Sequence, residues 1–152
     1  MEKKVKIKIS RQKLGKYAEL KVATELLKNQ IPVYFPFVDD EKIDFVVRIQ
    51  DETQVKHFDI QVKSVRGYNR ILGVPWEYIG TKPQNYLLVI AYIHQKKEDE
   101  FFFLTIKDLL ELMPKQKSEW RDLIFNKPER EKYKNRTITK LVNFLIEKDN
   151  IK

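Results

Sequence analysis

The sequence predicts one α/β domain, and three features support that fold class. The chain has 152 residues, the length of a single domain that can bury its own core. A helical pattern at about residues 10–29 is followed by three short strand-like segments, at residues 33–38, 43–49 and 57–63, which predicts an antiparallel meander. Residues 86–93 form an unbroken apolar run of strand length, which is typical of a strand buried on both faces in the middle of a sheet.

The composition limits the chemistry that the chain can carry. Cysteine is absent and the only histidines are His57 and His94, which excludes disulfides, thiolate nucleophiles and the usual zinc sites. A bound metal is therefore expected to be a hard ion such as Mg²⁺ or Mn²⁺, held by oxygen ligands. No apolar run approaches about 18 residues and no signal-peptide pattern follows the basic N-terminus, so we expect a soluble, cytoplasmic protein.

The charge of the chain is positive and unevenly distributed. The formal net charge is +8 and the pI is about 9.5, which favours an anionic partner, most commonly nucleic acid. Lys and Arg outnumber Asp and Glu by eight to two between residues 2 and 21, and by nine to four between residues 115 and 140. Basic flanks around a balanced centre are expected if phosphate-binding surfaces enclose a metal site, although a basic surface can also serve solubility alone.

The first helix is expected to begin after Ser10, a suitable N-cap, and to end at residues 30–32, where a proline follows. Glu19 falls inside the apolar arc of this helix, and Gly15 lies one turn earlier on the same face. A carboxylate there is paired, protonated or bound to a ligand, because an isolated buried charge costs several kcal/mol; alternatively, it reaches water at an open end of the helix. The apolar arc consists of Leu20, Val22, Ala23, Leu26 and Leu27.

The segment at residues 57–63 carries polar side chains where a buried strand would carry none. In a strand, Ile60 and Val62 point to one face, and Asp59, Gln61 and Lys63 point to the other. An acid, an amide and an amine therefore line up on one side. A face of this kind is most often solvated, so a chemical role requires partners from other elements.

The region after the third strand has no clear periodicity. Residues 65–84 are predicted to form a long irregular loop with a short strand near residues 71–76. Loops of this length in compact domains are often functional, and aromatic and basic side chains in it could contact nucleic acid. Trp76 fits a core position better than a base-stacking one.

The C-terminal part is predicted to pack rather than to carry chemistry. Residues 101–104 are expected to pair in a hairpin with the long apolar run. Thr105 and Asp108 have the spacing of a capping box at the start of a helix. Ser118 is expected to cap a further short helix, and a last helix is predicted near residues 137–148.

Three candidate site positions follow one another along the chain in a recognisable order. Glu19 lies on the first helix, Asp44 in Lys42-Ile43-Asp44-Phe45 begins the second strand, and Gln61-Val62-Lys63 lies on the third. This order resembles the PD-(D/E)XK nuclease superfamily, whose shared core is a helix, a three-stranded meander, a helix and a strand. The resemblance covers roughly residues 10–93, and it is greatest to archaeal Holliday-junction resolvases and to relatives that carry Gln-x-Lys instead of Glu-x-Lys.

The resemblance implies a fold, a reaction and a set of ligands. The fold would be a restriction endonuclease-like core at about residues 10–104, with a mixed central β-sheet flanked by helices in αβββ…β order, and extra C-terminal helices at about residues 105–152. Glu19, Asp44, Gln61 and Lys63 would be catalytic. The first three, with the Val62 carbonyl, would hold Mg²⁺ or Mn²⁺, and Lys63 would orient or deprotonate the attacking water.

The sequence also departs from this pattern. Gln61 is neutral where most members have an acid, which lowers the negative charge of the site; Asp59 could compensate as a metal ligand or could instead form a salt bridge. Ile43 replaces the proline that gives the family its name. Gly and Pro residues follow Lys63 where the family has a helix, so we expect a shortened or replaced helix there.

The expected activity is hydrolysis of DNA, selective for junctions or other branched structures, by a homodimer. RNA is not excluded as the substrate. The alternatives are a nuclease-fold protein that binds nucleic acid without cutting it and a basic α/β domain with an unrelated interaction role. The predicted nucleic-acid contacts are Lys13, Lys16, Arg66, Tyr68, Arg70, Lys127, Arg130, Lys132, Lys134 and Arg136.

Overall fold

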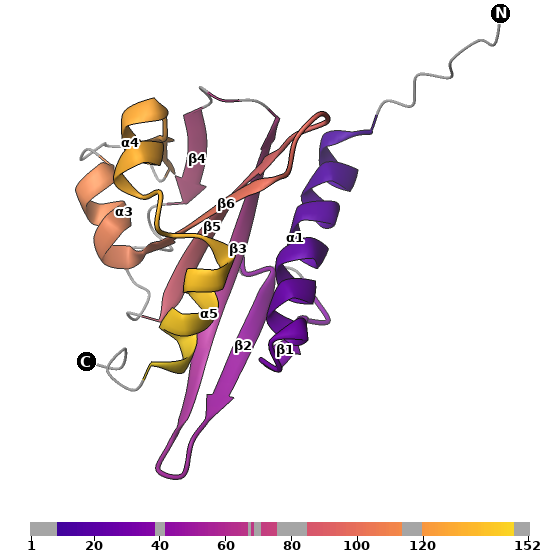
Figure 1. Cartoon of the computed structure of the whole chain (residues 1–152), viewed down its shortest axis with the longest axis vertical. Coiled ribbons are helices and arrows are strands. Elements are labelled where there is room, and N and C mark those ends of the chain that lie inside the picture. The colour runs from indigo at the N-terminus through magenta and orange to yellow at the C-terminus, as the bar shows by residue number, and fades with distance from the viewer. Residues whose placement is uncertain are drawn as a thin grey trace, which may run out of the picture.

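The computed structural model describes residues 9–38, 42–66, 68, 71–75, 85–113 and 120–147. It confirms an α/β fold in which helices flank a five-stranded mixed sheet (Figure 1). The elements are α1 (Arg11–Lys28), β1 (Val33–Tyr34), β2 (Phe45–Gln50), β3 (Val55–Arg66), β4 (Ile71–Pro75), β5 (Tyr86–Ile93), β6 (Glu100–Thr105), α3 (Ile106–Leu112), β7 (Trp120–Ile124), α4 (Lys127–Lys132) and α5 (Ile138–Ile146).

The main sheet has the strand order β1-β2-β3-β5-β6. The antiparallel pairs β1–β2 and β2–β3 confirm the predicted meander, and β6 pairs antiparallel with β5 as the predicted hairpin. β5 runs parallel to β3 and is buried along nearly its whole length. The sequence predicted that β5 is the middle strand of the sheet, but the middle strand is β3. β1 and β2 lie on one side of β3, and β5 and β6 lie on the other.

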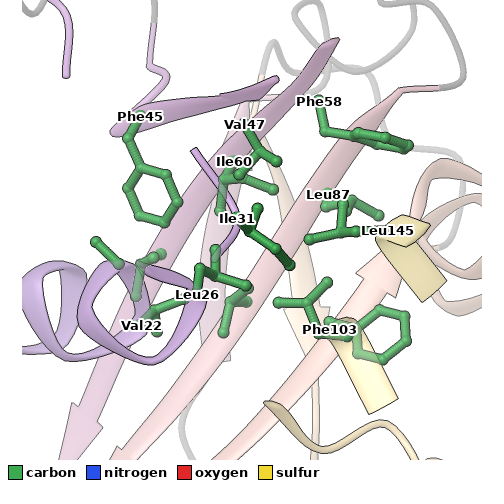
Figure 2. Close-up of a cluster of buried hydrophobic side chains, with 14 of the residues drawn as sticks. Val22, Leu26, Ile31, Phe45, Val47, Phe58, Ile60, Leu87, Phe103 and Leu145 are labelled. Atoms are coloured by element: carbon green, nitrogen blue, oxygen red, sulfur yellow. The ribbon is translucent and has the colours of Figure 1, made fainter. Parts of the chain in front are cut away.

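The two faces of the sheet are covered by different elements. α1 and α5 pack on one face, where Phe58, Ile60 and Val62 of β3 join a large apolar cluster (Figure 2). The second sheet, formed by β4 and β7, covers the other face together with α3, and Val65 of β3 joins that cluster. Since side chains alternate along a strand, Asp59, Gln61 and Lys63 point to this second face.

Local hydrogen bonds explain where the helices begin. Ser10 accepts a hydrogen bond from the Lys13 N–H at 3.3 Å, as predicted for the N-cap of α1. Thr105 and Asp108 form the predicted capping box of α3. Thr137 is the N-cap of α5, and its hydroxyl accepts a hydrogen bond from the Lys140 N–H.

Several element boundaries differ from the prediction. β1 contains only Val33 and Tyr34 of the expected 33–38 strand, because Pro36 cannot donate a ladder hydrogen bond. Leu20 and Leu27 were expected in the core, but both are exposed, because the buried stripe of α1 runs through Leu14, Ala18, Val22, Ala23 and Leu26. The short strand predicted near residues 71–76 is confirmed as β4, whereas the irregular loop predicted from residue 65 is wrong at its start, because β3 continues to Arg66.

The short helix predicted after Ser118 is also wrong. Residues 120–124 form strand β7, which pairs antiparallel with β4 and opposes Leu123 to Leu72. Pairing with β4 satisfies the backbone hydrogen bonds of both segments and buries these two leucines, which outweighs the weak local helix pattern. Ser118 and Trp76 lie outside the described residues. The structure adds a short helix, α4, that was not predicted.

Candidate functional site

Asp44 is held against β3 at the point where β2 begins. Its N–H donates to the Ile60 carbonyl at 2.9 Å, and its Oδ2 accepts from the Val62 N–H at 2.6 Å. β3 continues to Arg66, beyond Ile60, which pairs with the first residue of β2. The carboxylate therefore binds the β3 backbone at the residue immediately before Lys63.

Lys63 is a half-buried amine next to this carboxylate. Burial lowers the pKa of Lys63 below its ordinary value; the negative charge of Asp44 opposes the shift and the positive charge of Lys42 adds to it. The structure thus brings Asp44, the Val62 backbone and Lys63 together, as the sequence predicts. A lysine with a lowered pKa is a better proton acceptor near neutral pH than an exposed one.

Gln61 lies on the same strand face as Lys63 and is 5% exposed. Its Oε1 accepts a hydrogen bond from the hydroxyl of Tyr86, which is fully buried on the neighbouring strand β5. The phenol therefore fixes the orientation of the Gln61 amide. The sequence did not indicate Tyr86 as a site residue. Tyr86 begins a long apolar run, where a tyrosine is expected to pack its ring in the core, and no local pattern indicates a hydrogen bond from its hydroxyl.

Replacing Tyr86 by phenylalanine is expected to destabilise the fold by about 1–2 kcal/mol, because the buried Gln61 amide oxygen loses its donor. Replacing Gln61 by leucine in the same chain should recover most of that loss, since both polar partners are then gone. Urea unfolding of the two single variants and the double variant measures the coupling. Losses that simply add would show that the hydrogen bond contributes nothing.

Glu19 lies on α1, at the same level of the sheet as Val62. A Cβ at Gly15 would lie 3.8 Å from the Ser64 Oγ, so the first half of α1 faces the end of β3. The other end of α1 leads into β1, which lies at the level of Phe58, so α1 runs antiparallel to β3. Four residues along the helix cover about 6 Å, and two residues along the strand cover about 7 Å. Glu19 therefore lies at about the same level along β3 as Val62.

The Glu19 carboxylate is ion-paired and partly buried. Its Oε2 lies 2.6 Å from the Nζ of Lys16, and its side chain is 16% exposed, so the paired alternative for this residue is observed. α1 covers one face of the sheet, and Lys63 points to the opposite face. A joint site therefore requires the Glu19 side chain to reach around the part of β3 after Ile60, which does not pair with β2. Its role as a metal ligand stays a prediction.

The oxygen donors near Asp44 fit a hard divalent ion in chemical type. Carboxylate, amide and carbonyl oxygens are the ligands that Mg²⁺ accepts, usually together with several waters. Within the described ranges, no three or more His, Cys, Asp or Glu side chains gather as a metal-binding group. A site here thus depends on Gln61 and the Val62 carbonyl in addition to Asp44. Asp59 is half-buried on β3, and the structure leaves its ligand and salt-bridge alternatives open.

Some of the predicted nucleic-acid contacts are engaged within the protein. The guanidinium of Arg130 lies 3.8 Å from the centre of the Tyr68 ring, and the Tyr68 hydroxyl donates to Glu100. Arg136 forms a two-point ion pair with Asp108, at 2.8 and 3.3 Å. Tyr68, Arg130 and Arg136 therefore hold elements together, which weakens the expectation that they bind nucleic acid.

The remaining predicted contacts are basic side chains nearer the surface. Lys13 and Lys16 are exposed on α1, and Arg66 is exposed at the end of β3, where it donates to the Ile9 carbonyl at 2.9 Å. The three predicted lysines Lys127, Lys132 and Lys134 are exposed in and after α4, and the first and last of them line an open groove of about 630 Å³. Arg70 lies outside the described residues.

Comparison with models of protein families and with curated proteins finds no match to this chain. A site at Asp44 and Lys63 is therefore inferred from the geometry of this chain and not from a relative. Among the described residues, no helix is both long and apolar enough to cross a membrane.

Proposed function

We propose that this protein is a metal-dependent nuclease that hydrolyses phosphodiester bonds of DNA. The observation that carries the proposal is the Asp44 carboxylate, fixed on β3 by the Val62 N–H, beside the half-buried amine of Lys63. A hard-ion ligand and an amine with a lowered pKa are two groups that can assist the attack of water on a phosphodiester.

Each group has a separate task in this reaction. Asp44, the Gln61 amide oxygen and the Val62 carbonyl would hold the ion, with Glu19 as a further ligand. A bound Mg²⁺ or Mn²⁺ would supply charge stabilisation for the non-bridging oxygens and for the leaving oxygen. Lys63 in its neutral form accepts the proton of the attacking water, and in its charged form it offsets the phosphate charge.

The net charge of +8 supports an anionic polymer as the substrate. Branched DNA is the proposed preferred form, and a homodimer in the cytoplasm is the proposed assembly, because two symmetric sites can cut two symmetric strands. A second candidate function is binding of nucleic acid without cleavage. It is favoured by the neutral Gln61, whose amide oxygen already accepts from Tyr86.

The test is an incubation of the purified protein with branched, duplex and single-stranded DNA in Mg²⁺, Mn²⁺ or EDTA. We expect cleavage that requires metal and falls at least about 100-fold in Asp44→Ala and Lys63→Ala, because each variant loses a reacting group. Lys140→Ala, an exposed change of equal charge on α5, is the matched control and should cleave normally. Binding without cleavage in every condition would favour the second candidate function. A protein that neither binds nor cleaves DNA would exclude both candidate functions.

A further inference from the structure

The segment that begins with β1 exposes apolar side chains that a folded chain normally buries. Tyr34 is 54% exposed, Phe35 is 47% exposed and Phe37 is 105% exposed, and Val38 beside them is also exposed. Single exposed apolar residues are common, but a contiguous group of aromatic side chains marks an interaction surface.

This segment is held in place at the edge of the main sheet. β1 is the edge strand and pairs with β2 only at Val33 and Tyr34. The Phe35 ring packs against the buried Phe45 ring, with 5.7 Å between their centres. The exposed rings therefore extend from an anchored position next to the core.

The outer face of α1 carries two further exposed apolar side chains. Leu20 and Leu27 are exposed and lie two helical turns apart on the side of α1 that points away from the sheet. α1 contacts β1 at this edge of the molecule, and the two elements lie side by side in Figure 1. We name the edge surface as Tyr34, Phe35, Phe37 and Val38.

The area of the edge surface matches one side of a stable dimer. At about 150–250 Å² for each aromatic side chain, the three aromatic residues alone expose on the order of 400 Å². A standard interface buries about 800 Å² per partner, and a little over half of that area, about 450 Å², is apolar. Val38, which is 62% exposed, supplies the remainder.

We propose that the edge surface is the interface between two copies of this chain. A two-fold axis brings the same apolar side chains of two copies against one another, so one contact covers the edge surface of both chains. Phe35 packs on Phe45, so the edge surface adjoins the start of β2. The interface itself does not depend on the proposed nuclease activity.

Sedimentation equilibrium of the full chain at micromolar concentrations tests the proposal. The wild-type protein should have a mass of about 37 kDa, twice the 18.3 kDa of one chain. Phe37→Asp should weaken the dimer at least about 100-fold, because it places a charge in an apolar contact. Phe37 is fully exposed in one copy, so the variant should still fold, which circular dichroism verifies.

Leu110→Asp is the matched control, since Leu110 is an exposed leucine on α3 and lies outside the edge surface. It should remain a dimer. A wild-type monomer, or a dimer that persists in both Phe37→Asp and Phe35→Asp, would overturn the proposal. Failure of the nuclease proposal is distinguishable, because it would leave an inactive dimer that Phe37→Asp still dissociates.

Discussion

Replacement of Lys63 by methionine is expected to stabilise the fold while it abolishes cleavage. Burial lowers the pKa of the Lys63 amine, so the charged form of this side chain is less favourable in the folded protein than in the unfolded chain. Methionine has a similar length and carries no charge to desolvate. Because part of the side chain reaches solvent, which screens the cost of the charge, we expect a gain of only about 0.5 kcal/mol at neutral pH, which raises Tm by about 1–2 °C in a chain of this size.

The same substitution removes the proposed proton acceptor next to Asp44. Cleavage should therefore fall by about 100-fold or more, in the range usual for loss of a general base. Thermal unfolding and a cleavage assay of one preparation measure both effects, with Lys140→Met as the exposed control, which should change neither by much. A loss of stability together with a loss of activity would mean that Lys63 acts mainly through packing.

The stability difference should also depend on pH. Lysine ordinarily titrates near 10.5, and the pKa of Lys63 is lower than this in the folded state. Between the folded pKa and 10.5 the unfolded chain binds more protons than the folded chain, so wild-type stability rises with pH across that window. The cost of the buried charge is fully present below the window. The advantage of Lys63→Met should therefore shrink as pH increases toward about 10, which urea unfolding over this range measures.

The parts of the fold that the sequence predicts correctly depend on local patterns. The Ser10 cap and the Thr105–Asp108 capping box follow from side chains three residues apart. The meander and the buried strand β5 follow from the spacing and continuity of apolar residues. Asp44 and Lys63 were singled out by the resemblance in motif order rather than by these local patterns, and the pairing of β2 with β3 brings Asp44, the residue before β2, next to the Val62 N–H.

The parts that were wrong depend on contacts between distant residues. β7 exists because Leu123 pairs opposite Leu72 of β4, and no local pattern near residue 120 indicates that partner. The roles of Arg130 and Arg136 could not be predicted for the same reason, since a guanidinium binds a phosphate or an internal partner with the same chemistry. In the fold, one of them stacks on Tyr68 and the other pairs with Asp108.

Replacement of Asp44 by asparagine is expected to separate the structural and chemical roles of this side chain. The carboxylate accepts the Val62 N–H at 2.6 Å, and an asparagine amide oxygen can accept the same hydrogen bond. The free energy of unfolding of Asp44→Asn should therefore lie within about 1 kcal/mol of the wild-type value. That of Asp44→Ala should be lower by about 1–2 kcal/mol, because the Val62 N–H loses its acceptor. Urea unfolding of both variants measures this difference.

Cleavage should be lost in both variants, because a neutral amide at this position no longer supplies the negative charge that holds a divalent ion. Loss of the Asp44 charge should also lower the pKa of Lys63 further, since that charge opposes the effect of burial. An Asp44→Asn protein that is stable but inactive would assign the carboxylate to the chemistry. An Asp44→Asn protein that cleaves normally would restrict Asp44 to holding β2 against β3, and the ion would then have to be held elsewhere.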